Sequence, residues 1–254
     1  MCNNYRLHVP VNVIGDAFRQ ADRPLHFPDG QPNLPATDDI RIGDRAAVIT
    51  LEGETPQLTM TPWAWKGPGG RPVFNFRSDG RRFDGSTRCL IPADGFYEFT
   101  EAQPGEKRKT KWLFTMSGAS WFWIAGVVRD GAFAMLTTEP GPDVAPYHDR
   151  QVVVLAPEAG MAWLDLSRPE GEMLKALPAG ALSVDRVWPP AHSSHTAREA
   201  PRLASRRRTG DSPASPAGRR YVQAQAKGVG ARALVFSTVR RTPSLIVALG
   251  GQGR

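Results

Sequence analysis

The residue at position 2 offers the most reactive chemistry in the chain. Cys2 directly follows Met1 and is one of only two cysteines, the other being Cys89. Removal of Met1 would leave an amine and a thiol on adjacent carbons, which titrate at about 8 and about 8.5. The amine can condense with an aldehyde, and the thiolate can then close a thiazolidine ring. Position alone favours an ordinary residue at a frayed terminus, so other residues must support the reactive interpretation.

A polar pair alternates with phenylalanines in the predicted strand 72–77. Strand alternation places Phe74 and Phe76 on one face and Asn75 and Arg77 on the other. The Asn75 amide offers two donors and an acceptor, and the Arg77 guanidinium is a bidentate fork that suits phosphate. The same pattern also fits a solvated strand face.

Two further residues could transfer protons. Glu98 follows Phe96 and Tyr97, and burial among aromatic rings would raise its pKa toward the range of a general acid. His148 lies after Pro146, on a turn before the apolar run 152–155, where an imidazole can exchange protons near neutral pH. An edge-strand glutamate facing water and a surface-turn histidine are the alternatives.

Basic and aromatic residues interleave between positions 63 and 88. Phosphate contacts alternating with stacking rings are typical of a path for single-stranded nucleic acid, although a solvated basic loop has a similar composition. The residues that we predict to contact DNA are Trp63, Arg71, Arg77, Arg81 and Arg82.

Charge divides the chain into two parts. The net charge of the 254 residues is +7, but residues 191–254 hold twelve Lys or Arg against two acids. Residues 1–190 therefore carry 20 basic and 23 acidic side chains, a net charge of −3. We predict one folded domain over 1–190 and a disordered, low-complexity basic tail over 191–254. The tail is either a nucleic-acid-binding arm or sequence without selected structure.

Short β-branched or aromatic runs between turn residues predict strands from residue 46 onward. Their number and spacing favour a barrel or sandwich. Residues 21–44 are rich in proline, aspartate and glycine and predict a long ordered loop. Helices are expected over 10–18, 157–166 and 169–176. The expected strands are 46–51, 58–61, 72–77, 88–91, 95–100, 111–116, 121–128, 132–138, 151–155 and 185–187.

Composition also narrows the class of protein. The sequence has no leader pattern and no apolar run of about 18 residues, which predicts neither secretion nor membrane insertion. Two cysteines 87 positions apart, without a CxxC motif, predict no disulfide framework and no metal site. We therefore expect a cytoplasmic protein, where reducing conditions keep Cys2 free.

Taken together, the sequence resembles the SRAP family, the SOS response-associated peptidases that process abasic sites. The resemblance covers about residues 1–188, and its longest and most specific segment is the run 88–99. It is carried by Met1-Cys2-Asn3, Asn33-Leu34-Pro35-Ala36-Thr37, Met60-Thr61-Pro62-Trp63, Asn75-Phe76-Arg77, Arg88-Cys89-Leu90-Ile91-Pro92-Ala93-Asp94-Gly95-Phe96-Tyr97-Glu98-Phe99, Ala125-Gly126-Val127, Thr137-Thr138 and His148-Asp149-Arg150.

The resemblance implies both a fold and a reaction. The fold is α+β, a curved, barrel-like, mostly antiparallel β-sheet with a few flanking helices and a positively charged groove for single-stranded DNA. The chain would be a cofactor-free monomer that crosslinks abasic sites through Cys2 as a thiazolidine during the SOS response to DNA damage. It would act as a thiol autopeptidase on Met1, with AP-lyase side activity, and would be associated with the nucleoid when bound to DNA.

The resemblance also assigns roles to individual residues. Asn75 would position the terminal amine, Glu98 would promote opening of the sugar ring, and His148 would assist imine formation and ring closure. Arg77 would contact phosphate. Two alternatives use the same groups differently: a cysteine peptidase or amidohydrolase acting through Cys2, Glu98 and His148, or a non-catalytic single-strand binding module.

The chain departs from the family pattern in three respects. Asn3 and Asn4 stand where many members have Gly-Arg, which removes a cationic contact to DNA near the terminus. Ser78-Asp79-Gly80 stands where many members carry an acidic residue and a Ser or Thr. The segment between Arg77 and Arg88 is also short, which predicts that a helix usual there is missing.

Overall fold

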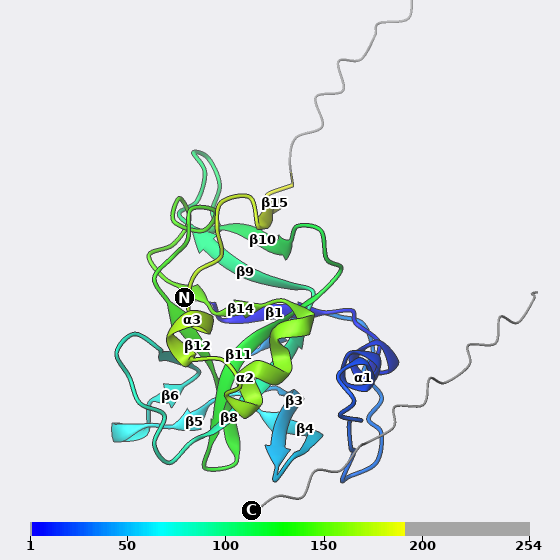
Figure 1. The fold of residues 1–254 in the computed structure, drawn as a ribbon. Coiled ribbons are helices and arrows are strands. Elements are labelled where there is room, and N and C mark those ends of the chain that lie inside the picture. Colours follow the sequence, from blue (N-terminus) through cyan, green and yellow to red (C-terminus); the bar gives the residue numbers. More distant parts are fainter. Residues whose placement is uncertain (1, 191–254) are drawn as a thin grey trace, which may run out of the picture. The chain divides into compact units, whose positions relative to one another are not determined.

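Two large β-sheets and a two-stranded sheet of β5 and β6 form the framework of residues 2–190, the part of the chain that the computed structural model describes (Figure 1). The strands are β1 (Asn4–Leu7), β2 (Thr37–Arg41), β3 (Arg45–Glu52), β4 (Thr55–Pro62), β5 (Trp65–Lys66), β6 (Pro72–Val73), β7 (Asn75–Arg77), β8 (Thr87–Ala93), β9 (Gly95–Thr100), β10 (Thr110–Met116), β11 (Phe122–Arg129), β12 (Ala132–Thr138), β13 (Gln151–Val152), β14 (Val154–Leu155) and β15 (Leu182–Trp188). The helices are α1 (Val11–Gln20), α2 (Gly160–Asp165) and α3 (Glu170–Met173), with 3-10 turns η1 (Pro68–Gly70) and η2 (Pro157–Ala159).

The first sheet has the order β15-β10-β9-β1-β2, and the second has the order β13-β12-β11-β8-β3-β4. In the second sheet β14 also pairs with β11, and β7 pairs with β12. Among the described strand pairs, only β7 with β12 is parallel. The predicted α+β fold of mostly antiparallel strands with few helices is thus confirmed. The term barrel fits it loosely, because these strands form open sheets rather than one closed barrel.

Two predicted strands are interrupted where the backbone changes partners. Phe74 breaks the run 72–77, and its carbonyl accepts hydrogen bonds from the Trp63 indole at 2.9 Å and from the Met135 N–H at 3.0 Å. Val153 breaks the run 151–155, since its N–H donates to Leu136 while its carbonyl accepts from Ala125. Each break lets one short segment bond to two neighbouring elements.

The hydrophobic pattern of the sequence did not predict the strands that are polar or very short. The predicted loop 21–44 contains β2, whose sequence Thr-Asp-Asp-Ile-Arg has little β-propensity. It pairs with β1, which was also missed. The predicted helix 169–176 shortens to α3, whereas the helix expected over 10–18 extends to Gln20. No helix lies between Arg77 and Arg88 in the structure, as the short segment predicted.

Aromatic side chains fill the core. Trp63 stacks on Phe133 with ring centroids 5.9 Å apart and meets Tyr5 edge-on at 5.6 Å. Helix α1 buries Ile14 and Phe18 on one face, and the Phe18 ring lies 5.7 Å from the Trp123 ring. Aromatic burial of this kind is a large part of what stabilises the fold.

Two further sequence predictions concern membrane insertion and the C-terminal tail. No helix within residues 2–190 is long and apolar enough to span a membrane. The predicted disordered tail 191–254 lies outside the described residues.

Gly126 in β11 is expected to be intolerant of a side chain. A Cβ added there would lie 2.9 Å from the Ala134 carbonyl oxygen and 2.9 Å from the Cys89 sulfur. Because the core has no room to relax around it, Gly126→Ala should destabilise the protein by about 1–3 kcal/mol in urea unfolding. The control is Gly171→Ala in α3, where no atom lies within 4 Å of the new Cβ. Equal unfolding midpoints for the two variants would contradict this account.

Candidate active site

Cys2 lies two residues before β1, beside β9. The pairing of Tyr5 with Phe96 and of Arg6 with Gly95 directs the start of the chain along β9 toward Glu98. Only 1% of Cys2 is exposed, and its thiol donates a hydrogen bond to the Asn4 carbonyl at 3.2 Å. Burial raises the pKa of the Cys2 thiol far above its usual value, and the Glu98 carboxylate raises it further. The thiol is therefore protonated in this state.

Asn75 connects Cys2 to the second sheet. Its Nδ2 donates to the Cys2 carbonyl oxygen at 2.7 Å. Pairing of Asn75 with Met135 in β12 fixes the strand that presents this amide. The Asn75 Oδ1 is buried and has no hydrogen-bond partner within residues 2–190. Asn75 therefore holds the backbone of Cys2 and keeps one acceptor available.

Glu98 is a buried acid. Only 1% of its side chain is exposed, so the alternative of an edge-strand glutamate facing water is wrong. Burial raises the pKa of Glu98 to about 7, although a hydrogen bond from the Cys2 backbone lowers it in part. Its carboxyl group is therefore present in both protonation states near neutral pH, as a general acid or base requires.

His148 faces Glu98 from the loop between β12 and β13. Its Nε2 lies 4.0 Å from the Glu98 Oε2, and burial lowers the pKa of the imidazole. The Arg150 N–H donates to Nδ1 at 3.0 Å, so in the neutral ring Nε2 carries the proton. The exposed Asp149 carboxylate, 2.8 Å from the same Nδ1, is the partner of that nitrogen when the ring is protonated.

Arg150 fixes the turn that carries His148. Its side chain is 8% exposed, donates to the Thr137 carbonyl at 2.8 Å and pairs with Asp79. These contacts tie the turn to β12 and to the segment after β7. The elements that present His148 and Asn75 are thus joined to each other.

A cavity of 390 Å³ opens beside these groups. It is lined by Asn3, Glu98, Phe99, Lys109 and His148. Lys109 was not singled out from the sequence, although it belongs to the basic run 107–111 in the hairpin between β9 and β10. Glu98 and His148 thus line this opening, whereas the buried Cys2 and the Asn75 amide that bonds to it lie behind its lining residues. Within the described residues, no group of three His, Cys, Asp or Glu side chains could hold a metal ion.

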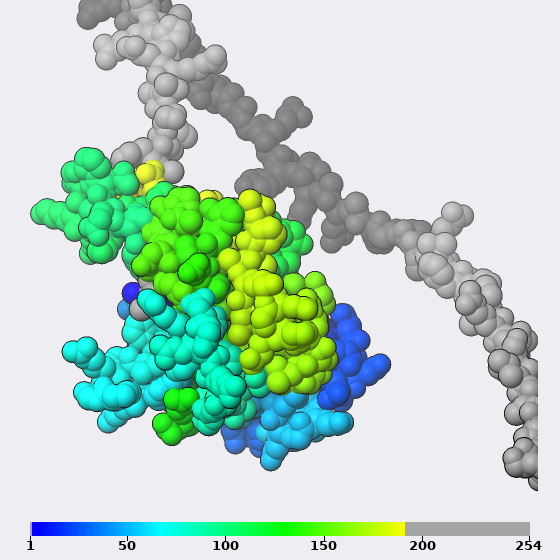
Figure 2. All heavy atoms as spheres, turned by 60° about the vertical axis from the view of Figure 1, so that its left-hand side comes forward, coloured from blue at the N-terminus to red at the C-terminus, as the bar shows by residue number. Residues whose placement is uncertain are grey.

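The predicted DNA-contacting arginines lie on one exposed segment near this opening. Arg71, Arg77, Arg81 and Arg82 are all exposed, and Arg81 lies over the Phe76 ring at 5.8 Å. Figure 2 shows the dark-blue start of the described chain between the cyan segment that includes these arginines and the green hairpin of β9 and β10. Cationic side chains are thus available on both sides of the chain start.

Trp63 requires a correction. The sequence predicted that it stacks on a DNA base, but the residue is fully buried between Tyr5 and Phe133. Its indole N–H donates to the Phe74 carbonyl rather than to a ligand. The bridge that joins it to Phe133 is a tertiary contact between distant segments, which sequence pattern does not reveal.

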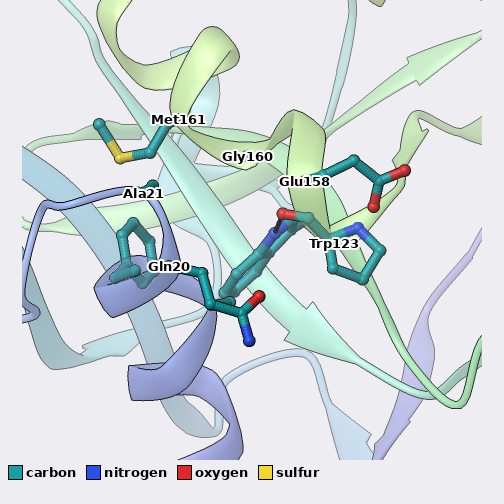
Figure 3. Close-up of a pocket in the computed structure, with 9 residues that line it drawn as sticks. Gln20, Ala21, Trp123, Glu158, Gly160 and Met161 are labelled. Atoms are coloured by element: carbon teal, nitrogen blue, oxygen red, sulfur yellow. Dashed lines mark hydrogen bonds between the residues drawn. The ribbon is translucent and has the colours of Figure 1, made fainter. Parts of the chain in front are cut away.

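Another cavity of 390 Å³ lies between α1 and α2 (Figure 3). Its walls include Phe18, Trp123 and Met161, with Gln20 and Glu158 at its edge. The described lining contains neither cysteine nor histidine. It therefore lacks the thiol and the imidazole that the predicted chemistry requires.

The family model for SOS response associated peptidase (SRAP) matches residues 1–189. The chain belongs to this family. Among its relatives, the abasic site processing protein YoaM of Bacillus subtilis is 26% identical over 201 residues, which cover 70% of this chain and 85% of that protein. The abasic site processing protein YoqW of the same species is 28% identical over 199 residues, covering 70% and 86%.

Solved structures share the SRAP fold. A phage-related protein of Bordetella bronchiseptica superimposes with a TM-score of 0.55 at 23% identity, covering 74% of this chain and 94% of that one. A protein of Bacteroides thetaiotaomicron gives the same TM-score at 16% identity, covering 73% and 91%. At these identities the similarity concerns the fold alone.

Burial of Glu98 predicts a pH-dependent stability. The folded protein keeps the Glu98 proton up to about pH 7, whereas the unfolded chain loses it near 4.5. The Glu98 contribution to stability therefore falls as pH rises between these values. Glu98→Gln should gain stability relative to wild type over this interval, by about 3 kcal/mol at most.

Melting temperatures between pH 4 and 8 measure this difference. Glu101→Gln is the control, since its carboxylate is 90% exposed, and its profile should run parallel to wild type. A constant offset between Glu98→Gln and wild type across this range would disprove the effect.

Proposed function

We propose that this SRAP protein binds single-stranded DNA at abasic sites and captures them covalently through Cys2. The observation that carries the proposal is the linked set of contacts around Cys2. Asn75 holds the Cys2 carbonyl at 2.7 Å, and the acid–base pair of Glu98 and His148 lies at the adjacent opening. The names of the relatives, abasic site processing proteins, support the substrate class.

The reaction needs an aldehyde, an amine and two proton carriers. Glu98, with a pKa of about 7, transfers protons as the deoxyribose hemiacetal opens to its aldehyde. The α-amine of Cys2, freed by removal of Met1, then attacks C1′ and expels one water to give an imine. His148 carries protons for the imine and ring-closing steps.

Ring closure suits a thiol that is protonated at the start. The sulfur of Cys2 adds to the imine carbon, and the thiol proton ends on the imine nitrogen, by way of Glu98 or His148. C1′ thereby carries one C–N and one C–S bond, and the only product released over both steps is water. A thiol with a raised pKa does not compete with the amine for the aldehyde, so the amine reacts first.

Thiazolidine formation explains why capture protects the strand. A protonated imine is an electron sink that promotes β-elimination and strand cleavage. Addition of sulfur removes that sink. We therefore assign the protein first to shielding of abasic sites during the SOS response and only secondarily to AP-lyase chemistry, on nucleoid DNA in the cytoplasm.

The same nucleophile accounts for the peptidase activity in the family's name. Cys2 would assist cleavage of the bond to Met1, which exposes the reactive amine. Asn75 would keep the Cys2 carbonyl in place during this step. The exposed Arg71, Arg77 and Arg82 would bind phosphates of the strand on one side of the opening.

Substitution of Cys2 tests the covalent step. Cys2→Ala should form no heat-stable adduct with an oligonucleotide that contains an abasic site, because both the thiol and ring closure are lost. Denaturing gels and intact mass measure the adduct. The matched control is Cys89→Ala, which removes the other cysteine, a fully buried one, and should leave adduct formation intact. A heat-stable adduct in Cys2→Ala would refute the mechanism.

Glu98→Gln separates chemistry from binding. The amide cannot exchange the proton, so crosslinking should slow by about 10²-fold or more. Affinity for undamaged single-stranded DNA should stay within about twofold of wild type, because the neutral amide keeps the shape of the site. Single-turnover crosslinking and fluorescence anisotropy measure the two quantities, and loss of both would mean that Glu98 is structural.

Two other outcomes would favour the alternatives. Multiple turnover on unrelated peptides would indicate a general cysteine peptidase. Intact mass with Met1 retained would indicate a non-catalytic DNA-binding module, because a blocked amine cannot form the imine.

A further inference from the structure

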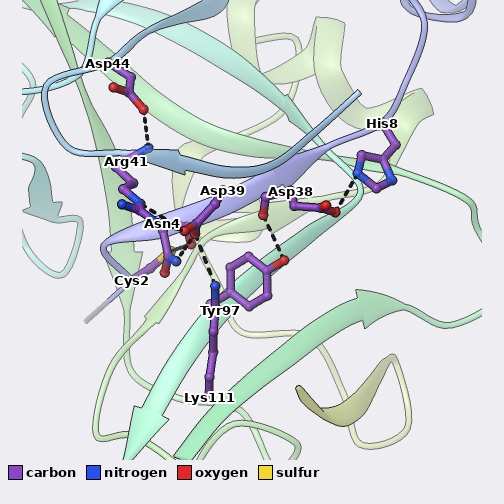
Figure 4. A network of polar contacts seen from close by, with 9 residues as sticks. All are labelled: Cys2, Asn4, His8, Asp38, Asp39, Arg41, Asp44, Tyr97 and Lys111. Carbon is purple, nitrogen blue, oxygen red and sulfur yellow. Dashed lines mark hydrogen bonds and ion pairs between the residues drawn. The ribbon is translucent and has the colours of Figure 1, made fainter. Parts of the chain in front are cut away.

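Strands β9 and β10 present different side chains on their two faces. On one face, the Lys111 ammonium group lies 3.7 Å from the centroid of the Tyr97 ring and donates a hydrogen bond to Asp39 (Figure 4). Because side chains alternate along a strand, Trp112 points to the other face. There it lies directly opposite Glu98 on the neighbouring strand. The buried acid thus has an aromatic ring as its cross-strand neighbour.

The ring of Tyr147 packs on the face that carries Glu98. Its centroid lies 4.7 Å from the Trp112 ring, and it meets Phe114 edge-on at 5.4 Å. Phe114 in turn stacks on Phe96 at 4.9 Å, two residues before the acid in β9. Tilted and edge-on arrangements are those that aromatic pairs prefer. Tyr147 is therefore attached to the first sheet beside Glu98.

The residue that follows Tyr147 is His148. The Val144 carbonyl accepts hydrogen bonds from both backbone N–H groups, that of Tyr147 at 2.8 Å and that of His148 at 3.0 Å. This turn fixes the direction in which the imidazole leaves the backbone, 4.0 Å from the Glu98 carboxyl group. Arg150 ties the other end of the turn to β12 in the second sheet. The ring of Tyr147 supplies the matching contact with the first sheet.

We propose that Tyr147 is a positioning residue for the reaction of this site. Its ring, packed against β10, holds the His148 imidazole beside Glu98. The ring contacts carry this role, so the hydroxyl group is not required. The inference rests on the proposed function, in which His148 carries protons, and it adds a residue to which the sequence analysis gave no role.

Removal of the ring tests the proposal. Tyr147→Leu keeps an apolar side chain and should slow single-turnover crosslinking to an abasic oligonucleotide by about 10- to 100-fold, since a small displacement of a catalytic group has an effect of this size. A strand with tetrahydrofuran in place of the abasic sugar cannot crosslink, and its Kd should change by less than about twofold. Tyr147→Phe keeps the ring and should crosslink at the wild-type rate.

A double-mutant cycle separates positioning from a general loss of structure. His148→Ala should slow crosslinking at least as much as Tyr147→Leu does. Adding Tyr147→Leu to His148→Ala should then slow it by less than about a further twofold, because the residue acts through the imidazole. The control is Trp121→Leu, which removes a ring that pairs with Trp123 at 4.5 Å and does not line the active-site cavity. Its crosslinking rate should equal that of wild type.

An NMR titration of the imidazole measures the same effect without DNA. Burial lowers the pKa of His148, so loss of the neighbouring ring should admit water and raise that pKa toward 6.5. The carboxyl group of Glu98, with a pKa of about 7, is mostly neutral in this range, and Asp149 is already exposed. Tyr147→Phe should leave the His148 pKa unchanged, and the spectrum of His148→Ala identifies the signal.

Three results would overturn the role: equal slowing by Tyr147→Leu with and without His148, an unchanged His148 pKa in Tyr147→Leu, or slow crosslinking by Tyr147→Phe. Tyr147→Met, which keeps a longer apolar side chain, replaces the leucine variant in every comparison should that variant not fold. No adduct with wild-type protein would refute the proposed function. The titration would still decide whether Tyr147 positions His148.

Discussion

The hydrogen bond from Asn75 to the Cys2 carbonyl is the constraint on which the site depends. Asn75 belongs to the second sheet, and Cys2 precedes β1, which lies between β9 and β2 in the first sheet. This bond therefore fixes the start of the chain at the junction of the sheets instead of leaving it frayed in solvent. Residues near a chain end are usually poorly ordered unless something ties them down. Here the tie also places Cys2 close to the buried Glu98 carboxyl group, to which the His148 ring is adjacent.

Burial at this junction raises the pKa of both Cys2 and Glu98, and the chemical consequences differ. It makes the Cys2 thiol harder to ionise, and it brings the pKa of Glu98 to about 7. A poorly ionised thiol would handicap an enzyme that relies on direct thiolate attack. It suits a reaction that begins at the amine and uses the thiol only after the imine has formed. The same desolvation that suppresses one group thus prepares the other for proton transfer.

Hydrogen bonds between residues far apart in the sequence hold the segments around the site in place. Arg150 bonds the His148 turn to β12. The Asp39 carboxylate accepts hydrogen bonds from Asn4, Arg41 and Lys111, which join β1, β2 and β10. Both arrangements use a buried or partly buried charge with several partners, which restricts side-chain rotation before any ligand arrives. Such pre-organisation reduces the entropy that binding must overcome.

Local sequence patterns were enough to predict the fold class, most strands and the family, because strand alternation and the motif around Glu98 are read from neighbouring residues. It also singled out Cys2, Asn75, Glu98 and His148 as the candidate reactive residues. The burial of Trp63 in the core and the position of Lys109 in the wall of the site became evident from the three-dimensional structure alone. Likewise, Lys111 meets Asp39 across 72 residues because the sheet order β10-β9-β1-β2 brings their strands close together. Contacts between such distant residues follow from strand order and burial, which no local pattern encodes.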